Sequence, residues 1–292
     1  MLLTRILGII FPIFAIVSVG YAYGRWRRVD MSMVNTLNMD VLVPALLFFV
    51  LSSKNFDLAR YGDLALGATA VVLGSGVLAL GVAWLARIQA KTLVPPMMFT
   101  NTGNMGLPLA VFAFGEQALP AAVVLLIITN TLHFTLGTFL MDHRAPLLGV
   151  IRKPIVAATL LGLGFNMIGW TLPGPVNVTM QMLGEASIPL LLFSLGVRLT
   201  EVDLRDWRIG ALGAVLCPLT GIAMVLMLRP LLDLTPLQSG LFLVFGALPP
   251  AVLNFLVAEQ FNQEPKNVAS IVLLGNLAAT VAIPLVLFFA LR

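Results

Sequence analysis

The sequence predicts an all-α integral membrane protein with ten transmembrane helices. Hydrophobic residues make up 59% of its 292 residues, charged residues only 10%, and the mean hydropathy is +1.01. A soluble domain carries about 25% charged residues, so a soluble fold is excluded. A chain of this length can hold about ten apolar segments of roughly 20 residues, the length that crosses a bilayer.

The expected spans follow one another with short connections. The first apolar stretch is too long for the core of a cleaved signal peptide and has no small-residue cleavage site, so we expect it to remain as a span. We place the ten spans at about 5–24, 34–53, 62–86, 94–114, 119–141, 153–171, 181–199, 208–232, 237–260 and 268–291.

The basic residues predict an orientation. Of the 17 Lys and Arg residues, twelve follow odd-numbered spans and five lie on the other side, termini included. The positive-inside rule therefore places the odd-numbered loops in the cytoplasm and both termini on the non-cytoplasmic side of a bacterial inner membrane. The formal charge of +4 is scattered singly between spans and does not indicate a nucleic-acid partner. No Lys or Arg lies well inside an expected span.

The two halves of the chain are weakly similar at an offset of 143 to 146 residues. Two pairs align in similar surroundings, Pro44 with Pro189 and Asp40 with Glu185. Each half, 1–145 and 146–292, is therefore expected to hold five spans. An odd number of spans inverts the second copy relative to the first, so we expect a five-plus-five inverted repeat.

The fourth and ninth spans are each interrupted by helix-breaking residues. Proline removes an amide donor and obstructs the carbonyl one turn earlier, and lipid cannot satisfy the freed backbone groups. A matched pair of broken helices, crossing near the bilayer midplane, indicates the substrate site of a transporter. The breaking residues are Gly103, Gly106 and Pro108 in the fourth span and Pro249 and Pro250 in the ninth.

Opened helix segments expose amide groups and positive dipole ends, which suit a carboxylate. Because no basic residue lies within the spans, the candidate substrate-binding residues are neutral: Asn101, Thr102, Asn104, Thr129, Asn130, Pro249, Pro250, Asn254 and Asn276. Two alternatives stay open. The prolines could only kink packed helices, and asparagines such as Asn130 and Asn276 could only join helices to one another.

Two acids, Asp40 and Glu185, lie within the expected spans. They are candidates for coupling to an ion or proton, or for supporting a helix start. Their neighbours Pro44 and Pro189, with Gly103, Gly106 and Pro108, are expected to support the structure. For His133, packing between helices competes with a role as a proton relay. No cofactor, metal-site or enzyme motif is present.

Several strings resemble the auxin efflux carrier family, which includes bacterial malonate-type permeases and plant PIN-type carriers: LNMDVLVPALLF, NTGNMGLPL, KPIVAATLLGLGFN and ALPPAVLNFLVAEQF. The resemblance implies a five-plus-five inverted repeat with a scaffold part and a transport part. It also implies that Asn101, and Thr129 with Asn130, contact a substrate carboxylate. The crossover prolines of the family correspond to Pro249 and to a position occupied here by Thr100.

The function expected from these features is that of a permease, not an enzyme, which moves a small mono- or dicarboxylate across the inner membrane by alternating access. A sodium-coupled symporter of the bile-acid type and a non-transporting membrane sensor are the alternatives. The expected partners are the organic anion and the lipid bilayer. Protons and sodium are both candidate coupling ions, and a homodimer is a candidate assembly.

Overall fold

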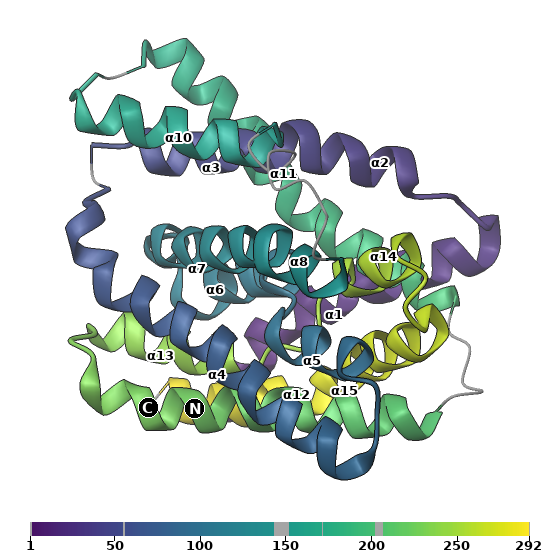
Figure 1. Cartoon of the computed structure of the whole chain (residues 1–292). Helices are drawn as coiled ribbons and strands as arrows, with labels where there is room; N and C mark the ends of the chain where they lie inside the picture. The colour runs from purple at the N-terminus through teal and green to yellow at the C-terminus, as the bar shows by residue number, and fades with distance from the viewer. Residues whose placement is uncertain (1, 55, 143–151, 171, 202–206, 292) are drawn as a thin grey trace.

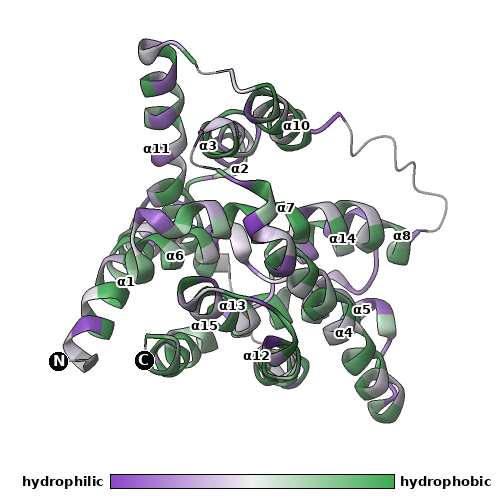
Figure 2. Ribbon diagram, turned by 90° about the vertical axis from the view of Figure 1, so that its left-hand side faces the viewer, coloured by the Kyte–Doolittle hydropathy of each residue, from purple (hydrophilic) through white to green (hydrophobic). Residues whose placement is uncertain are grey.

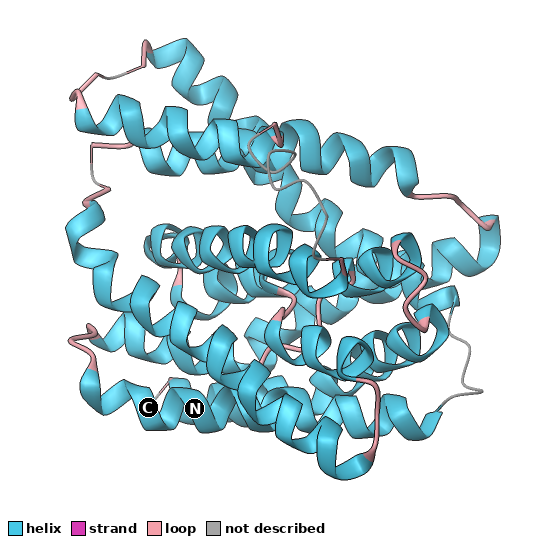
Figure 3. Cartoon of the chain, in the orientation of Figure 1, coloured by secondary structure: helices cyan, strands magenta, loops and turns pink. Residues whose placement is uncertain are grey.

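The computed structural model of the chain describes residues 2–54, 56–142, 152–170, 172–201 and 207–291. Every regular element among these residues is helical, apart from one isolated β-bridge (Figure 3). The all-α prediction is therefore confirmed for the described residues. Both ends of the chain lie at the same side of the molecule (Figure 1).

The elements follow this order along the chain. The first half contains α1 (Leu2–Arg27), α2 (Ser32–Leu37), η1 (Asn38–Leu42), α3 (Val43–Ser52), η2 (Leu58–Tyr61), α4 (Gly62–Ala86), α5 (Ala90–Met98), η3 (Thr102–Gly106), α6 (Leu107–Phe114), η4 (Glu116–Ala118), α7 (Leu119–Leu132), η5 (His133–Gly137) and α8 (Thr138–Met141). The second half contains α10 (Pro154–Met167), α11 (Gly174–Arg198), η6 (Leu199–Glu201), α12 (Trp207–Leu228), η7 (Arg229–Leu231), α13 (Pro236–Gly246), α14 (Leu253–Gln260) and α15 (Pro265–Ala290).

Among the described residues, seven helical stretches are long and apolar enough to cross a membrane, and three shorter apolar helices accompany them. These stretches lie close to the expected spans. The expected span at 153–171 is shorter in the structure: α10 begins at Pro154 and ends before Gly169, which has a φ of +67°. Such a left-handed residue stops a helix, and glycine adopts it without a steric cost.

Hydrophobic residues predominate along the helices, as the colouring by hydropathy shows (Figure 2). Large hydrophobic residues such as Phe11, Val77 and Trp84 are at least 70% exposed. A soluble protein rarely exposes this much contiguous apolar surface, whereas a bilayer covers it with lipid tails.

The long helices pack in pairs. α1 lies along α11, α10 along α3, α12 along α15, and α4 against α5 and α12. Glycine permits two of the closest approaches between α1 and α11. A Cβ at Gly20 would collide with the carbonyl oxygen of Phe193, and one at Gly196 with that of Val17. Small residues at such contacts are typical of helix packing in membranes.

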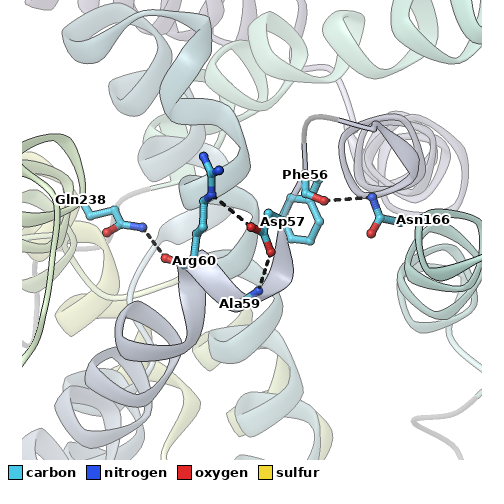
Figure 4. A network of polar contacts seen from close by, with 6 residues as sticks. All are labelled: Phe56, Asp57, Ala59, Arg60, Asn166 and Gln238. Atoms are coloured by element: carbon cyan, nitrogen blue, oxygen red, sulfur yellow. Dashed lines mark hydrogen bonds and ion pairs between the residues drawn. The ribbon is translucent and has the colours of Figure 1, made fainter. Parts of the chain in front are cut away.

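The segment between α3 and α4 is held by side chains from the second half of the chain (Figure 4). Asn166 Nδ2 donates to the carbonyl oxygens of Ser53 and Phe56, at 2.7 and 2.9 Å. Gln238 Nε2 donates to the carbonyl oxygen of Arg60 at 2.8 Å. These bonds fasten α10 and α13 to one connection, at the end of the molecule that also holds the termini.

Candidate functional site

The two interrupted helices meet at their breaks. The helical structure stops between α5 and η3 and again between α13 and α14, and there Thr100 and Pro250 form an isolated antiparallel bridge. On either side of it an amide donates to a carbonyl oxygen of the other segment: Asn101 N to Pro249 O at 2.7 Å, and Ala251 N to Phe99 O at 2.9 Å. Each unwound backbone therefore satisfies the other, which makes both breaks tolerable inside a membrane.

A buried asparagine on α15 joins this crossing to a neighbouring helix. Asn276 Nδ2 donates to the carbonyl oxygens of Pro250 and Val272, at 3.0 and 2.8 Å. Its Oδ1 accepts a hydrogen bond from Asn101 Nδ2 at 2.9 Å. Asn276 thus contacts both broken segments and uses its polar atoms to hold them.

Two further asparagines belong to the crossing itself. Asn254 Nδ2 donates to the carbonyl oxygen of Phe99 at 2.8 Å. The Oδ1 of Asn101 accepts from the backbone amide of Asn104 at 3.2 Å and so caps the start of η3. The side chain of Asn101 and the Nδ2 of Asn254 are therefore engaged within the protein, whereas the buried Oδ1 of Asn254 has no partner in the described structure.

A cavity of about 440 Å³ lies beside the crossing. Residues from η1, η3 and η5, which are π-helical, contribute to its lining. π-Helical turns widen a helix locally and are frequent at functional sites. From the crossing, the cavity is lined by Thr100, Asn101, Thr102, Gly103, Asn104, Ala251, Val252 and Leu253.

Three amide side chains that line the cavity are available to a ligand: Asn35 on α2, Asn104 and Asn130. These side chains make no hydrogen bond within the described part of the chain, and all three are half-buried. An amide group offers two donors and an acceptor. The cavity therefore presents unused hydrogen-bonding groups beside an apolar wall that includes Leu107, Leu126 and Leu191.

Charged side chains also reach the cavity: Asp40 from η1, Lys153 next to the start of α10, and Arg198 from the end of α11. The Lys153 Nζ lies 4.3 Å from the centroid of the Phe134 ring. Lys153 and Arg198 were not among the residues expected at the site, because the sequence places them at loop boundaries. Their depth depends on how α10 and α11 pack, for which the sequence holds no local signal.

His133 lines the cavity from η5 and is almost completely buried. Its ring stacks on that of Phe99, with centroids 4.2 Å apart and an angle of 8° between the planes. Its Nε2 has no hydrogen-bond partner in the described structure. Gly137, one turn further, allows this stacking, since a Cβ there would lie 2.8 Å from the Phe99 ring and 2.9 Å from His133.

Several residues expected to bind substrate lie outside the cavity lining. Thr129 is buried and donates to the carbonyl oxygen of Leu125 at 2.9 Å, on the same helix. The others form the crossing or secure it: Pro249, Pro250, Asn254 and Asn276. In the described structure these four residues stabilise the crossing and do not line the cavity.

The two expected intramembrane acids occupy different surroundings. Both are exposed, but Asp40 lines the cavity, whereas Glu185 lies outside the lining and accepts a hydrogen bond from Gln181 Nε2 at 2.7 Å. Pro44 is buried in the first turn of α3, and Pro189 lies exposed within α11.

The expected supporting residues of the first break are also positioned by the structure. Gly103 lines the cavity, and Pro108 lies in the first turn of α6. A Cβ at Gly106 would come within 3.0 Å of Leu248 on the other broken segment. Gly106 therefore permits the close approach of the two breaks.

Comparison with known proteins relates the chain to transporters. The model of the membrane transport protein family matches residues 144–287. A protein of Rhizobium meliloti, provisionally named a malonate transporter, is 24% identical over 96% of this chain and 94% of its own length. The uncharacterized transporter YfdV of Escherichia coli is 22% identical over 97% of both chains. An uncharacterized transporter of Methanocaldococcus jannaschii is 21% identical over 90% of this chain and 92% of its own.

The chain is a membrane transporter, because it has helices apolar enough to span a membrane and is similar to transporters over nearly its whole length. The family match and the relatives that cover nearly the whole chain confirm the resemblance of the sequence to the auxin efflux carrier family.

Proposed function

We propose that this transporter moves a small organic anion, of the mono- or dicarboxylate class, across the bacterial inner membrane by alternating access. The observation that carries the proposal is the cavity beside the crossed breaks, with the unused amides of Asn104 and Asn130 in its lining. Amide donors suit carboxylate oxygens, and a cavity of about 440 Å³ has room for a small organic anion.

The charges around the cavity support an anionic substrate. Lys153 and Arg198 line it together with Asp40, so the formal charge of the lining is positive. An anion in a site of low dielectric constant needs opposite charge or several donors to offset the loss of water. The name of the Rhizobium meliloti relative refers to malonate, a short dicarboxylate, and agrees with this class.

The helix packing supports a ten-helix inverted repeat with halves 1–145 and 146–292. If α1, α3, α4, α5–α6 and α7–α8 of the first half correspond to α10, α11, α12, α13–α14 and α15 of the second, the contacts come in matching pairs. α1 along α11 then matches α10 along α3, and α12 along α15 matches α4 along α7. In inverted repeats the substrate site lies between the halves, and rocking of one part exposes it to either side in turn.

The side of the membrane to which the cavity opens is inferred from the positive-inside rule. Ser32, Lys153 and Arg198 line the cavity and adjoin loops that follow odd-numbered spans. The excess of basic residues assigns these loops to the cytoplasm, which leaves both termini outside. The described conformation is then the one that admits substrate from the cytoplasmic side.

Transport in proteoliposomes tests the proposal. The purified protein is reconstituted and given radiolabelled acetate, lactate, malonate and succinate, with protein-free liposomes as the blank. We expect uptake or exchange of at least one of these anions above the blank, and a strong reduction in the double variant Asn104→Ala/Asn130→Ala. Absence of transport of every carboxylate by the correctly folded parent protein contradicts the proposed class.

A further inference from the structure

We propose that Lys153 is the residue that selects anionic substrates, and that Asp40 competes with the substrate for its ammonium group. This inference rests on the proposed function and deepens it, because it assigns the charge recognition of the site to a pair of residues. Both residues line the cavity, and no contact within 4.0 Å joins them among the described ion pairs.

The depth of Lys153 is set by the packing of α10 on α3. The two helices run in the same direction: Gly162 lies against Phe48 and Leu51, and Asn166 binds the carbonyl oxygens of Ser53 and Phe56. When this alignment is extended back to the start of α10, Lys153 lies level with η1. The helix α10 also contacts η1.

The neighbouring helix α2 begins at Ser32, eight residues before Asp40. At 1.5 Å per residue, Lys153 therefore lies about 12 Å deeper than the start of α2. A lysine at a loop boundary of the sequence thus lies deeper along the cavity than the start of α2, although its side chain stays exposed.

Two features make this position suitable for an anion. The ammonium of Lys153 lies over the Phe134 ring, which attracts the cation without occupying its hydrogen-bond donors. Pro154 and Ile155, the first residues of the 14-residue helix α10, line the cavity, so the positive end of the helix faces it. His133 lines the same cavity, but its Nε2 is buried and has no partner in the described structure.

Asp40 influences how tightly the site binds its substrate. It lies on η1, the element level with Lys153, and it is the acidic residue among the described residues that line the cavity. With no substrate bound, Asp40 attracts the ammonium through the cavity. A substrate carboxylate must replace this attraction, which weakens binding and favours release. Arg198, the other charged lining residue, lies at the end of α11.

Binding measurements on the purified, full-length protein test the inference. Acetate, lactate, malonate and succinate are titrated by calorimetry into the parent protein and four variants. For the anion that the parent binds, Lys153→Gln is expected to weaken binding about 10- to 100-fold, the effect of losing a hydrogen bond to a charged group. Lys153→Arg is expected to retain most of the affinity, because it keeps the charge.

Two further variants separate charge recognition from general electrostatics and from misfolding. Arg152→Gln removes the same charge one position away, from a residue outside the cavity lining, and is expected to bind like the parent. Asp40→Asn is expected to bind several-fold more tightly, a gain that damage to the fold cannot produce. Melting temperatures of all variants are measured in the same detergent.

The outcomes are distinct. Equal affinity of the parent and Lys153→Gln overturns the role of Lys153 while leaving the proposed function intact. Weaker binding in Asp40→Asn overturns the competition between Asp40 and the substrate. If a well-folded parent binds none of the four anions, the proposed substrate class fails, and this inference fails with it.

Discussion

The side-chain amide of Asn101 donates a hydrogen bond to the side-chain oxygen of Asn276, 2.9 Å away, and so joins the first broken helix to α15. Since Asn276 also donates to the carbonyl oxygen of Pro250 in the second break, one side chain connects both unwound segments. Asn101, Asn276 and Pro250 are buried, and the surrounding bilayer supplies no water that could replace a lost hydrogen bond. The crossing therefore depends on Asn276 for its geometry.

Replacement of Asn276 by alanine is expected to destabilise the protein. It leaves the Asn101 amide and the Pro250 carbonyl without this partner, and an unsatisfied buried polar group costs about 1–3 kcal/mol. Thermal unfolding in detergent measures the effect. Thr280→Ala is the matched control, because Thr280 lies on the same helix, is exposed, and donates only to Leu277 of that helix. Equal melting temperatures of the two variants would contradict the role given to Asn276.

The breaks and the approximate positions of the spans could be predicted because their causes are local. The Pro249–Pro250 pair opens its helix wherever that helix lies, and apolar length reports a span without knowledge of its neighbours. For the fourth span the sequence predicts a break around Gly103 and Gly106, and in the structure the helix opens at residues 99–101, directly before them. These features need no knowledge of tertiary structure.

The division of roles among the candidate residues could not be predicted, because it depends on contacts between distant segments. Asn101 and Asn276 are 175 residues apart in the sequence. Thr129 and Asn130 are neighbours, yet the helical turn of about 100° per residue directs only Asn130 into the cavity. The same reason explains Lys153, whose depth follows from the packing of α10 on α3.

Asn104 and Asn130 are expected to act on substrate affinity and not on stability. Each alanine substitution removes an amide that has no partner in the described structure, so the fold loses little. For a carboxylate substrate we expect affinity to fall about 10- to 100-fold for each amide that contacts it. Calorimetric titration and melting temperature are measured on the same samples. Asn101→Ala is expected to show the opposite balance, with a lower melting temperature, because both ends of its amide are engaged.

Close packing of α12 on α13 predicts a strong effect of a single methyl group. A Cβ at Gly221 would collide with the carbonyl oxygen of Gly246, at the end of α13 next to the second break. Backbone cannot move as a side chain does, so Gly221→Ala is expected to cost about 1–3 kcal/mol of stability. Gly81→Ala is the control, since nothing lies within 4 Å of its added Cβ. Comparable yields and melting temperatures of both variants would contradict the close approach of these two helices.

Cysteine labelling is expected to decide the orientation in the membrane. Met33 lies on α2 near the cavity, and Met167 ends α10 at the opposite side of the molecule; both are more than 80% exposed. The native Cys217 is completely buried, so the parent chain should resist a membrane-impermeant thiol reagent and serve as its own blank. In intact cells we expect the reagent to label Met167→Cys only. In inverted membrane vesicles we expect it to label Met33→Cys only. The reverse pattern would place the cavity mouth outside the cell and both termini in the cytoplasm, against the charge rule from which the orientation is inferred.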